Sequence, residues 1–163
     1  MTSSLPESID DLYRYTPTDV AIFNTITPNT LWSKLNECDK CIFFRNMVVK
    51  SLIAKDFNNS NADVKTIFVP RDRTDGAEYG MIPHQFISSL TIPGQLFIMP
   101  EQSPINIKVQ NKQKEYMSIN IKEIGDGGHA FIQILDRLWI VIVPNILCSN
   151  GVIHLIEEVY AWD

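Results

Sequence analysis

The stretch "SNGVIHLIEEV", residues 149–159, decides the fold expected for this chain. It sets an Asn-Gly pair, which favours a tight turn, before a run of apolar residues whose side chains would alternate on a strand. On that strand Val152, His154 and Ile156 would share one face, and the residues between them would share the other. Both faces are apolar apart from the histidine, so we expect an interior strand that carries a buried imidazole.

The buried imidazole of His154 needs hydrogen-bond partners, because an unpaired buried polar group costs about 1–3 kcal/mol. A backbone carbonyl or a nearby hydroxyl would suffice, so we predict an architectural role for His154 rather than a catalytic one. Asn150 and Gly151 both tolerate left-handed backbone angles, and we expect them to turn the chain sharply into the last strand. Replacing Gly151 by valine is expected to destabilise the fold.

Further strands are predicted upstream of this segment. The run "KTIFVP" (65–70) is rich in β-branched and aromatic residues and ends at a proline. "LWIVIV" (138–143) is apolar on both faces and is expected at the centre of a sheet. Residues 125–128, "GDGG", tolerate positive φ and are predicted to close a hairpin. The predicted strands lie at 65–70, 94–100, 104–110, 116–124, 129–136, 137–144 and 151–162.

Helical periodicity occupies the first third of the chain. One helix is predicted over 18–26, and a second begins with Thr27 as the N-cap and Pro28 at the first helical position. A third is predicted over 40–55, with its apolar stripe formed by Ile42, Phe43, Val49, Leu52 and Ile53. Helices followed by mostly antiparallel strands predict an α+β domain, with the N-terminal helices packed against one side or edge of a β-wedge or sandwich.

Two of these segments resemble the sequence hallmarks of the fasciclin domain, an adhesion and interaction module. "KTIFVPRD" (65–72) resembles the first hallmark, and the Asn-Gly-Val-Ile-His run resembles the second almost residue for residue. Between them, "MIPHQFISSL" (81–90) carries a histidine where the family usually has a tyrosine-histidine pair, with proline in place of the tyrosine. Family adhesion is often attributed to that pair, so integrin-like binding does not follow from the resemblance.

The resemblance covers roughly residues 18–162 and implies a compact wedge of two β-sheets with helices along one edge. It also implies that the motif residues serve the architecture of the domain. These residues are Thr66, Phe68, Pro70, His84, Asn150, Gly151 and His154.

Length and composition limit the remaining possibilities. A chain of 163 residues with 45% hydrophobic residues is long enough for one core, and we expect an arm over 1–17 and one domain over 18–163. The formal charge of −5, without a basic patch, makes nucleic acid an unexpected partner. The longest apolar segment, 139–143, is too short to cross a membrane, and the first twenty residues lack the pattern of a secretory signal. An intracellular or virion location is therefore expected.

The sequence offers few groups suited to catalysis or metal binding. Cys38 and Cys41 form a C-x-x-C pair, which could be a redox site or half of a zinc site with Cys148 and a histidine. No second pair with suitable spacing exists, and the three cysteines are predicted to be free thiols. Asp72, with Asp75 and Glu78, is read as part of a solvated loop rather than a calcium site. We expect no catalytic residue, no metal, no cofactor and no small-molecule substrate.

The function predicted from these features is non-catalytic binding to other proteins, with a structural or scaffolding role in a larger assembly. Heavy use of isoleucine, asparagine and lysine suggests an AT-rich genome, and an accessory capsid protein of a large DNA virus is one such role. One alternative is a secreted or cell-surface adhesion protein, for which "NNS" (58–60) offers a glycosylation acceptor at Asn58. A zinc-binding or thiol-dependent enzyme is a further alternative.

Overall fold

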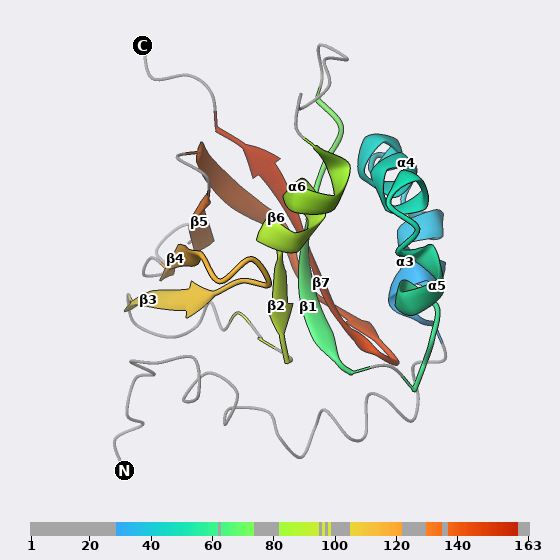
Figure 1. Cartoon of the computed structure of the whole chain (residues 1–163). Helices are drawn as coiled ribbons and strands as arrows, with labels where there is room; N and C mark the ends of the chain where they lie inside the picture. The colour runs from blue at the N-terminus through green and yellow to red at the C-terminus, as the bar shows by residue number, and fades with distance from the viewer. Residues whose placement is uncertain are drawn as a thin grey trace.

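The computed structural model describes residues 29–61, 63–73, 82–94, 96, 98, 105–121, 130–134 and 137–159. The arm expected at 1–17, the helix expected at 18–26 and the turn expected at 125–128 lie outside these residues. The described elements, in chain order, are α3 (Leu31–Glu37), α4 (Ile42–Lys50), α5 (Ala54–Phe57), β1 (Lys65–Pro70), α6 (Pro83–Ser89), β2 (Thr91–Pro93), β3 (Ile105–Gln110), β4 (Tyr116–Ile121), β5 (Ala130–Ile134), β6 (Arg137–Cys148) and β7 (Gly151–Glu158) (Figure 1).

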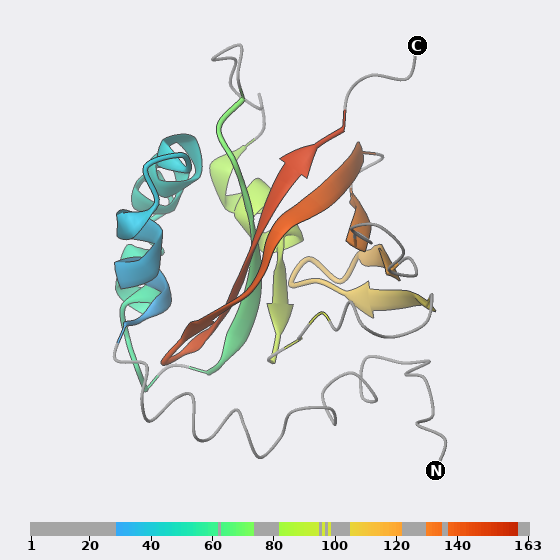
Figure 2. The same cartoon turned by 180° about the vertical axis from the view of Figure 1, so that it is seen from behind.

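The strands form one hydrogen-bonded sheet in the order β2-β1-β7-β6-β5-β4-β3. β1 and β7 run parallel, and every other neighbouring pair is antiparallel. Figures 1 and 2 show β6 and β7 crossing the molecule as a long twisted pair, with α3, α4 and α5 stacked on one side of the sheet. The α+β class predicted from the sequence is confirmed. The ladder is continuous across the described strands, so both halves of the expected wedge belong to a single bent sheet.

The central strand β6 is longer than predicted. A strand ending at Pro144 was expected, but β6 continues to Cys148. Its register against β7 shifts between the pairs Val143 with Leu155 and Ile146 with Ile153, so two residues of β6 oppose a single residue of β7. This is a β-bulge, and because Pro144 lies within it, the missing N–H of the proline costs no ladder hydrogen bond. The central position expected for this strand is confirmed by the strand order.

The first described helix also begins later than predicted. Thr30 is its N-cap, since the Thr30 hydroxyl accepts a hydrogen bond from the Ser33 N–H at 3.1 Å, and α3 starts at Leu31. The helix predicted to begin at Pro28, with Thr27 as its cap, is therefore displaced by one turn. Several capping residues follow one another here, and the sequence alone does not select among them.

The single helix predicted over 40–55 is divided into α4 and α5. Leu52 has a φ of 60°, and the N–H groups of Leu52 and Ile53 donate to the carbonyls of Val49 and Val48, each at 3.1 Å. This is a Schellman motif, whose left-handed position is usually glycine, and a side chain there costs about 1 kcal/mol. The predicted stripe was wrong in part: Ile42, Val49 and Leu52 are exposed, whereas Phe43 and Ile53 are half-buried against the core. The fully buried residues of α4 are Phe44, Met47 and Val48.

The strand predicted over 94–100 is not found at the residues of that segment that the structure describes. Gly94, Leu96 and Ile98 lie outside any strand, and the short strand β2 precedes them. The side chains of Thr66 and Asn145 bond the backbone of this segment to the sheet instead. Its alternating apolar residues are nonetheless buried, since Leu96 and Ile98 are 0% and 1% exposed.

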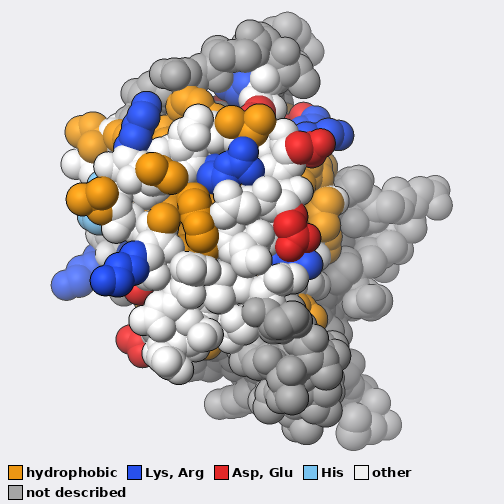
Figure 3. All heavy atoms as spheres, turned by 90° about the vertical axis from the view of Figure 1, so that its right-hand side faces the viewer, with side chains coloured by type: hydrophobic (Ala, Val, Ile, Leu, Met, Phe, Trp, Pro, Cys, Tyr) orange, Lys and Arg blue, Asp and Glu red, His pale blue; other side chains and the backbone are white. Residues whose placement is uncertain are grey.

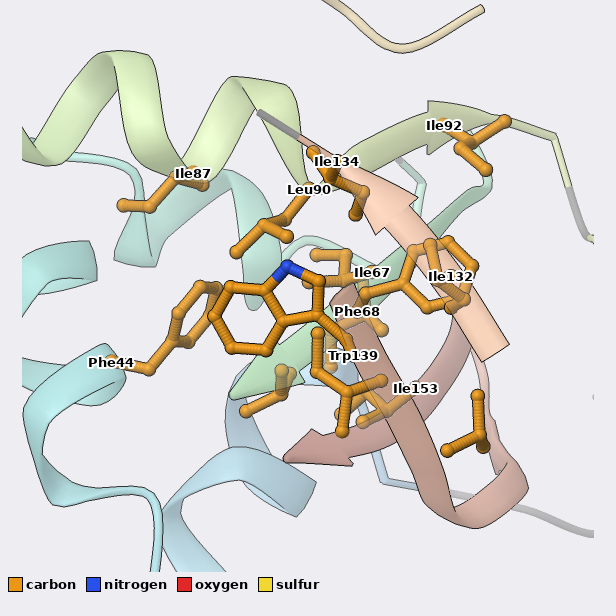
Figure 4. Packing of buried hydrophobic residues seen from close by; sticks show 14 of the residues in the cluster. Phe44, Ile67, Phe68, Ile87, Leu90, Ile92, Ile132, Ile134, Trp139 and Ile153 are labelled. Carbon is orange, nitrogen blue, oxygen red and sulfur yellow. The ribbon is translucent and has the colours of Figure 1, made fainter. Parts of the chain in front are cut away.

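The core lies between the helices and the sheet, and side chains from several elements converge on Trp139 of β6 (Figure 4). Phe44 of α4 and Phe68 of β1 are fully buried beside it, and the rings of Phe86 and Trp139 lie 6.5 Å apart between centroids. α6 packs against both α4 and β2 and so covers part of the core. Figure 4 shows that helix, strand and loop residues share one continuous cluster.

Candidate functional site

The two sequence hallmarks lie side by side in the sheet, between β2 and β6. β1 and β7 pair in parallel, with Lys65 opposite Gly151, Phe68 opposite His154 and Pro70 opposite Ile156. Every residue of β1 is buried, as are the first four of β7. Segments about eighty residues apart in sequence therefore build one interior pair of strands, and their motif side chains face the inside of the domain.

Asn150 connects the turn before β7 to two helices. Its Oδ1 accepts the Leu31 N–H at 2.8 Å, and Leu31 is the first residue of α3. Its Nδ2 donates to the carbonyls of Phe57 at 2.8 Å and Asn59 at 3.1 Å, at the end of α5. The side chain is fully buried, so it satisfies backbone groups at helix ends that water cannot reach. The Asn150 side chain thus caps the start of α3 and the end of α5.

Gly151 is required for space rather than for backbone conformation. Neither Asn150 nor Gly151 has a positive φ, so the left-handed turn expected from the sequence was wrong. A Cβ built on Gly151 would lie 2.1 Å from the backbone oxygen of Lys65 and 3.1 Å from a methyl group of Leu31. Since the first of these contacts is with backbone, β1 and β7 could not keep their spacing if residue 151 carried a side chain.

The motif residues of β1 fasten the segment that follows β2. The Thr66 hydroxyl donates to the Gly94 carbonyl and accepts the Leu96 N–H, each at 2.7 Å. Phe68 stacks on the imidazole of His154, with centroids 5.2 Å apart and planes inclined by 26°. Pro70 ends β1 in a buried position. These side chains hold neighbouring backbone in place and are closed to solvent.

His154 is fully buried, and both of its ring nitrogens are bonded. Nδ1 accepts the backbone N–H of Asn145 at 3.0 Å, which leaves Nε2 to carry the proton and donate to the Leu96 carbonyl at 2.8 Å. Burial lowers the pKa of His154 to about 4, although the bond to Leu96 acts in the opposite direction. The ring is therefore neutral near pH 7 and has no nitrogen available for a substrate.

The bond from Asn145 explains why a histidine occupies this strand. Asn145 lies in the bulge of β6, has a φ of 58°, and points its N–H away from the ladder toward the ring of His154. Its side chain exchanges two further bonds with the backbone of Ile98, at 2.9 and 2.7 Å. The imidazole thus accepts an N–H that the bulge would otherwise leave unpaired. Asn145 was not predicted from the sequence, although asparagine tolerates the left-handed conformation and is common in turns.

His84 is the one motif residue that the structure places elsewhere. It lies near the start of α6 and is exposed, whereas the other six are buried around β1 and β7. The structure therefore brings together Thr66, Phe68, Pro70, Asn150, Gly151 and His154 but leaves His84 on the surface.

The three cysteines are free thiols. Burial raises the pKa of Cys41 well above its usual value, and the adjacent Cys38 thiol adds to that effect. Burial also raises the pKa of Cys148 to about 12. Both thiols are thus protonated at neutral pH, which is unfavourable for a nucleophile or a metal ligand. Within the residues described, no three His, Cys, Asp or Glu side chains are grouped in a way that could hold a metal ion.

Asp72 caps a helix that is distant in sequence. Its two carboxylate oxygens accept the N–H groups of Ile42 at 3.1 Å and Phe43 at 2.9 Å, at the start of α4. Asp72 lies in a loop, as predicted, and is partly exposed, but its capping role was not predicted; Asp75 and Glu78 lie outside the described residues. No local pattern could have indicated this cap, because its helix begins thirty residues earlier. A cleft of about 350 Å³ beside it is lined by Asp39, Lys40, Arg71 and Asp72.

The fold and its buried motif pair define a fasciclin-type α+β domain. A comparison with protein-family models finds no match. The chain is 64% identical, over an alignment of 174 residues that covers 100% of both proteins, to a FAS1 domain-containing protein of Invertebrate iridescent virus 6. The chain therefore belongs to the FAS1, or fasciclin, domain family, and the resemblance inferred from its sequence is confirmed.

A solved structure supports the same fold. A FAS1 domain pair from the insect cell adhesion molecule fasciclin I superposes with a TM-score of 0.58 at 18% identity, covering 83% of this chain and 52% of that one. The chain thus spans about half the length of that two-domain structure. In the part of the chain that the structure describes, no helix is long and apolar enough to cross a bilayer.

Proposed function

We propose that this chain is a non-catalytic protein-protein interaction module with a structural or scaffolding role in a larger assembly. The observation that carries the proposal is the burial of six motif residues around β1 and β7. The polar side chains among them bond to backbone inside the domain, so they fix the fold and are closed to a substrate. The neutral His154 ring and the protonated buried thiols also argue against acid-base or thiolate chemistry at these sites.

We further propose that the assembly is a virus particle, in which the chain is an accessory, minor capsid protein. Support comes from the 64% identical relative in Invertebrate iridescent virus 6. A virion component needs a compact, stable domain and an exposed binding surface, and it needs no cofactor. The expected location is the virion or the interior of an infected cell.

Quantitative mass spectrometry of purified, protease-treated particles tests the assembly role. The chain is expected at a fixed ratio to the major capsid protein, with crosslinks from exposed lysines such as Lys50 and Lys112 to other chains. Absence from the particles, or a monomer that crosslinks only to itself, would contradict the proposal.

Two further measurements on the same material separate the alternatives. A glycan on Asn58 would favour the secreted adhesion protein, because the glycosylation machinery acts in the secretory pathway. Stoichiometric zinc by elemental analysis would favour the metal-binding or thiol-dependent enzyme. Neither a glycan nor zinc is expected.

A further inference from the structure

The outer side of α4 and the residue after it form an apolar and basic surface, which we call the α4 face. Its apolar members are Ile42, Val49 and Leu52, which are 45%, 52% and 88% exposed. Figure 3 looks onto this side of the molecule and shows hydrophobic side chains together with basic and acidic ones. Exposed apolar side chains that gather on one element indicate a binding surface more than scattered ones do.

Leu52 makes the α4 face unusual. It occupies the left-handed position of a Schellman motif, where glycine would be free of strain, and its side chain gains almost no burial there. A strained residue is retained when another interaction compensates for the strain. The described part of the chain offers Leu52 little cover, so its side chain is available for a contact with another segment.

The charge of the α4 face indicates what covers it. Residues 40–55 contain Lys40, Arg45, Lys50 and Lys55 and no acidic residue, and with the exposed Asp39 and Asp56 directly beside this range the surface keeps a net positive charge, although the whole chain has a formal charge of −5. Two α4 faces would repel each other, so a symmetric contact between copies is disfavoured. The complementary partner is a segment that combines apolar anchors with acidic residues.

The N-terminal residues of this same chain have that composition. Residues 1–13 contain Glu7, Asp10 and Asp11 and no basic residue. Their aliphatic residues are Leu5, Ile9 and Leu12, at the spacing that places side chains on one side of a helix. We propose that residues 1–17 bind the α4 face of the same chain, with these aliphatic side chains against Leu52 and Val49.

The connection is long enough for this contact. Residues 18–28 lead to Asn29, and eleven residues extend to at most about 40 Å. They join the described domain next to α5, because the Thr30 hydroxyl bonds to Asn58 at 2.9 Å. A short tether gives an effective concentration in the millimolar range, which favours binding within one chain over binding between chains. The contact is internal, so it would exist with or without the assembly role proposed above.

Photo-crosslinking of the full chain tests the proposal. A benzoylphenylalanine placed at position 52 is irradiated at low micromolar concentration, and the protein is digested with trypsin. The expected product is a monomer in which the peptide 51–55 is joined to the peptide 1–14, since trypsin cuts after Lys50, Lys55 and Arg14. Position 116 provides the matched control, because Tyr116 is 72% exposed on β4, and β5 and β6 separate β4 from β7, the strand that contacts α3. No link to 1–14 is expected from it.

Charge reversal supplies the second readout. The variant Asp10→Lys/Asp11→Lys is expected to lower the crosslinking yield from position 52 about three- to tenfold, with links to every peptide within 1–14 counted together because trypsin also cuts after the two new lysines. The variant Glu115→Lys, an exposed position beside the control site, is expected to leave that yield unchanged. The proposal is overturned by a link from position 52 to any other segment, by a product that is only a covalent dimer, or by a yield that the double reversal does not change.

Discussion

The buried imidazole of His154 makes the stability of this domain depend on pH. Its pKa is about 4 in the folded chain, against an ordinary value of 6.5 when the chain unfolds. Because the folded pKa is the lower one, the unfolded state binds more protons at every pH between these values. The contribution of His154 is therefore fully present above pH 6.5 and is lost as the pH falls toward 4.

The size of this effect follows from linkage. A difference of one pKa unit corresponds to about 1.4 kcal/mol. Lowering the pH from 7 to 5 should therefore reduce the free energy of unfolding by about 2 kcal/mol through His154 alone. Above pH 5 most carboxylates remain ionised, so their contribution to the change is small.

Urea denaturation, followed by tryptophan fluorescence at several pH values between 5 and 7, measures the effect. His154→Gln is the control, because the glutamine amide can accept one hydrogen bond and donate another without titrating. This variant should be less stable at pH 7 but should lose much less stability on acidification. Equal pH dependence in the two proteins would refute the reasoning, and so would a wild-type stability that does not change between pH 7 and 5.

Further substitutions test the other contacts of the fold by the same denaturation assay. Gly151→Ala should cost more than about 3 kcal/mol, because its methyl group meets the Lys65 carbonyl; a loss below 1 kcal/mol would contradict the steric argument. Asp72→Ala should cost about 1–2 kcal/mol through the unpaired N–H groups of α4, whereas Asp39→Ala in the same cleft should change stability by less than about 0.5 kcal/mol. Lys114→Gly should stabilise the fold by about 0.5–1 kcal/mol because residue 114 has a φ of 64°, and a destabilised variant would count against that.

Much of the interior could be predicted from the sequence because its signals are local. The runs around Phe68 and His154 are apolar on both faces, and alternation along the strand places the imidazole inside. The class of fold followed from the order of helices and strands. What the sequence did not reveal was that β1 and β7 are neighbours, since a parallel pair leaves no turn between its members.

The errors arose where distant residues decide a local structure. Pro144 reads as the end of a strand, and only the ring of His154 on the next strand lets β6 continue past it. The helix over 42–50 has apolar residues on more than one face, so periodicity alone did not show that Phe44, rather than Val49, would be buried. The capping role of Asp72 could not be predicted, because α4 lies close to it only in the folded chain.

The parallel pairing of β1 with β7 has a consequence for synthesis on the ribosome. Lys65 emerges long before Gly151, so the sheet cannot be completed until β7 has been translated. Until then the edge of β1 that pairs with β7 is unpaired, and another nascent chain can add a strand to it. We expect ribosome-stalled intermediates to recruit chaperones, with release coinciding with the emergence of the final strand.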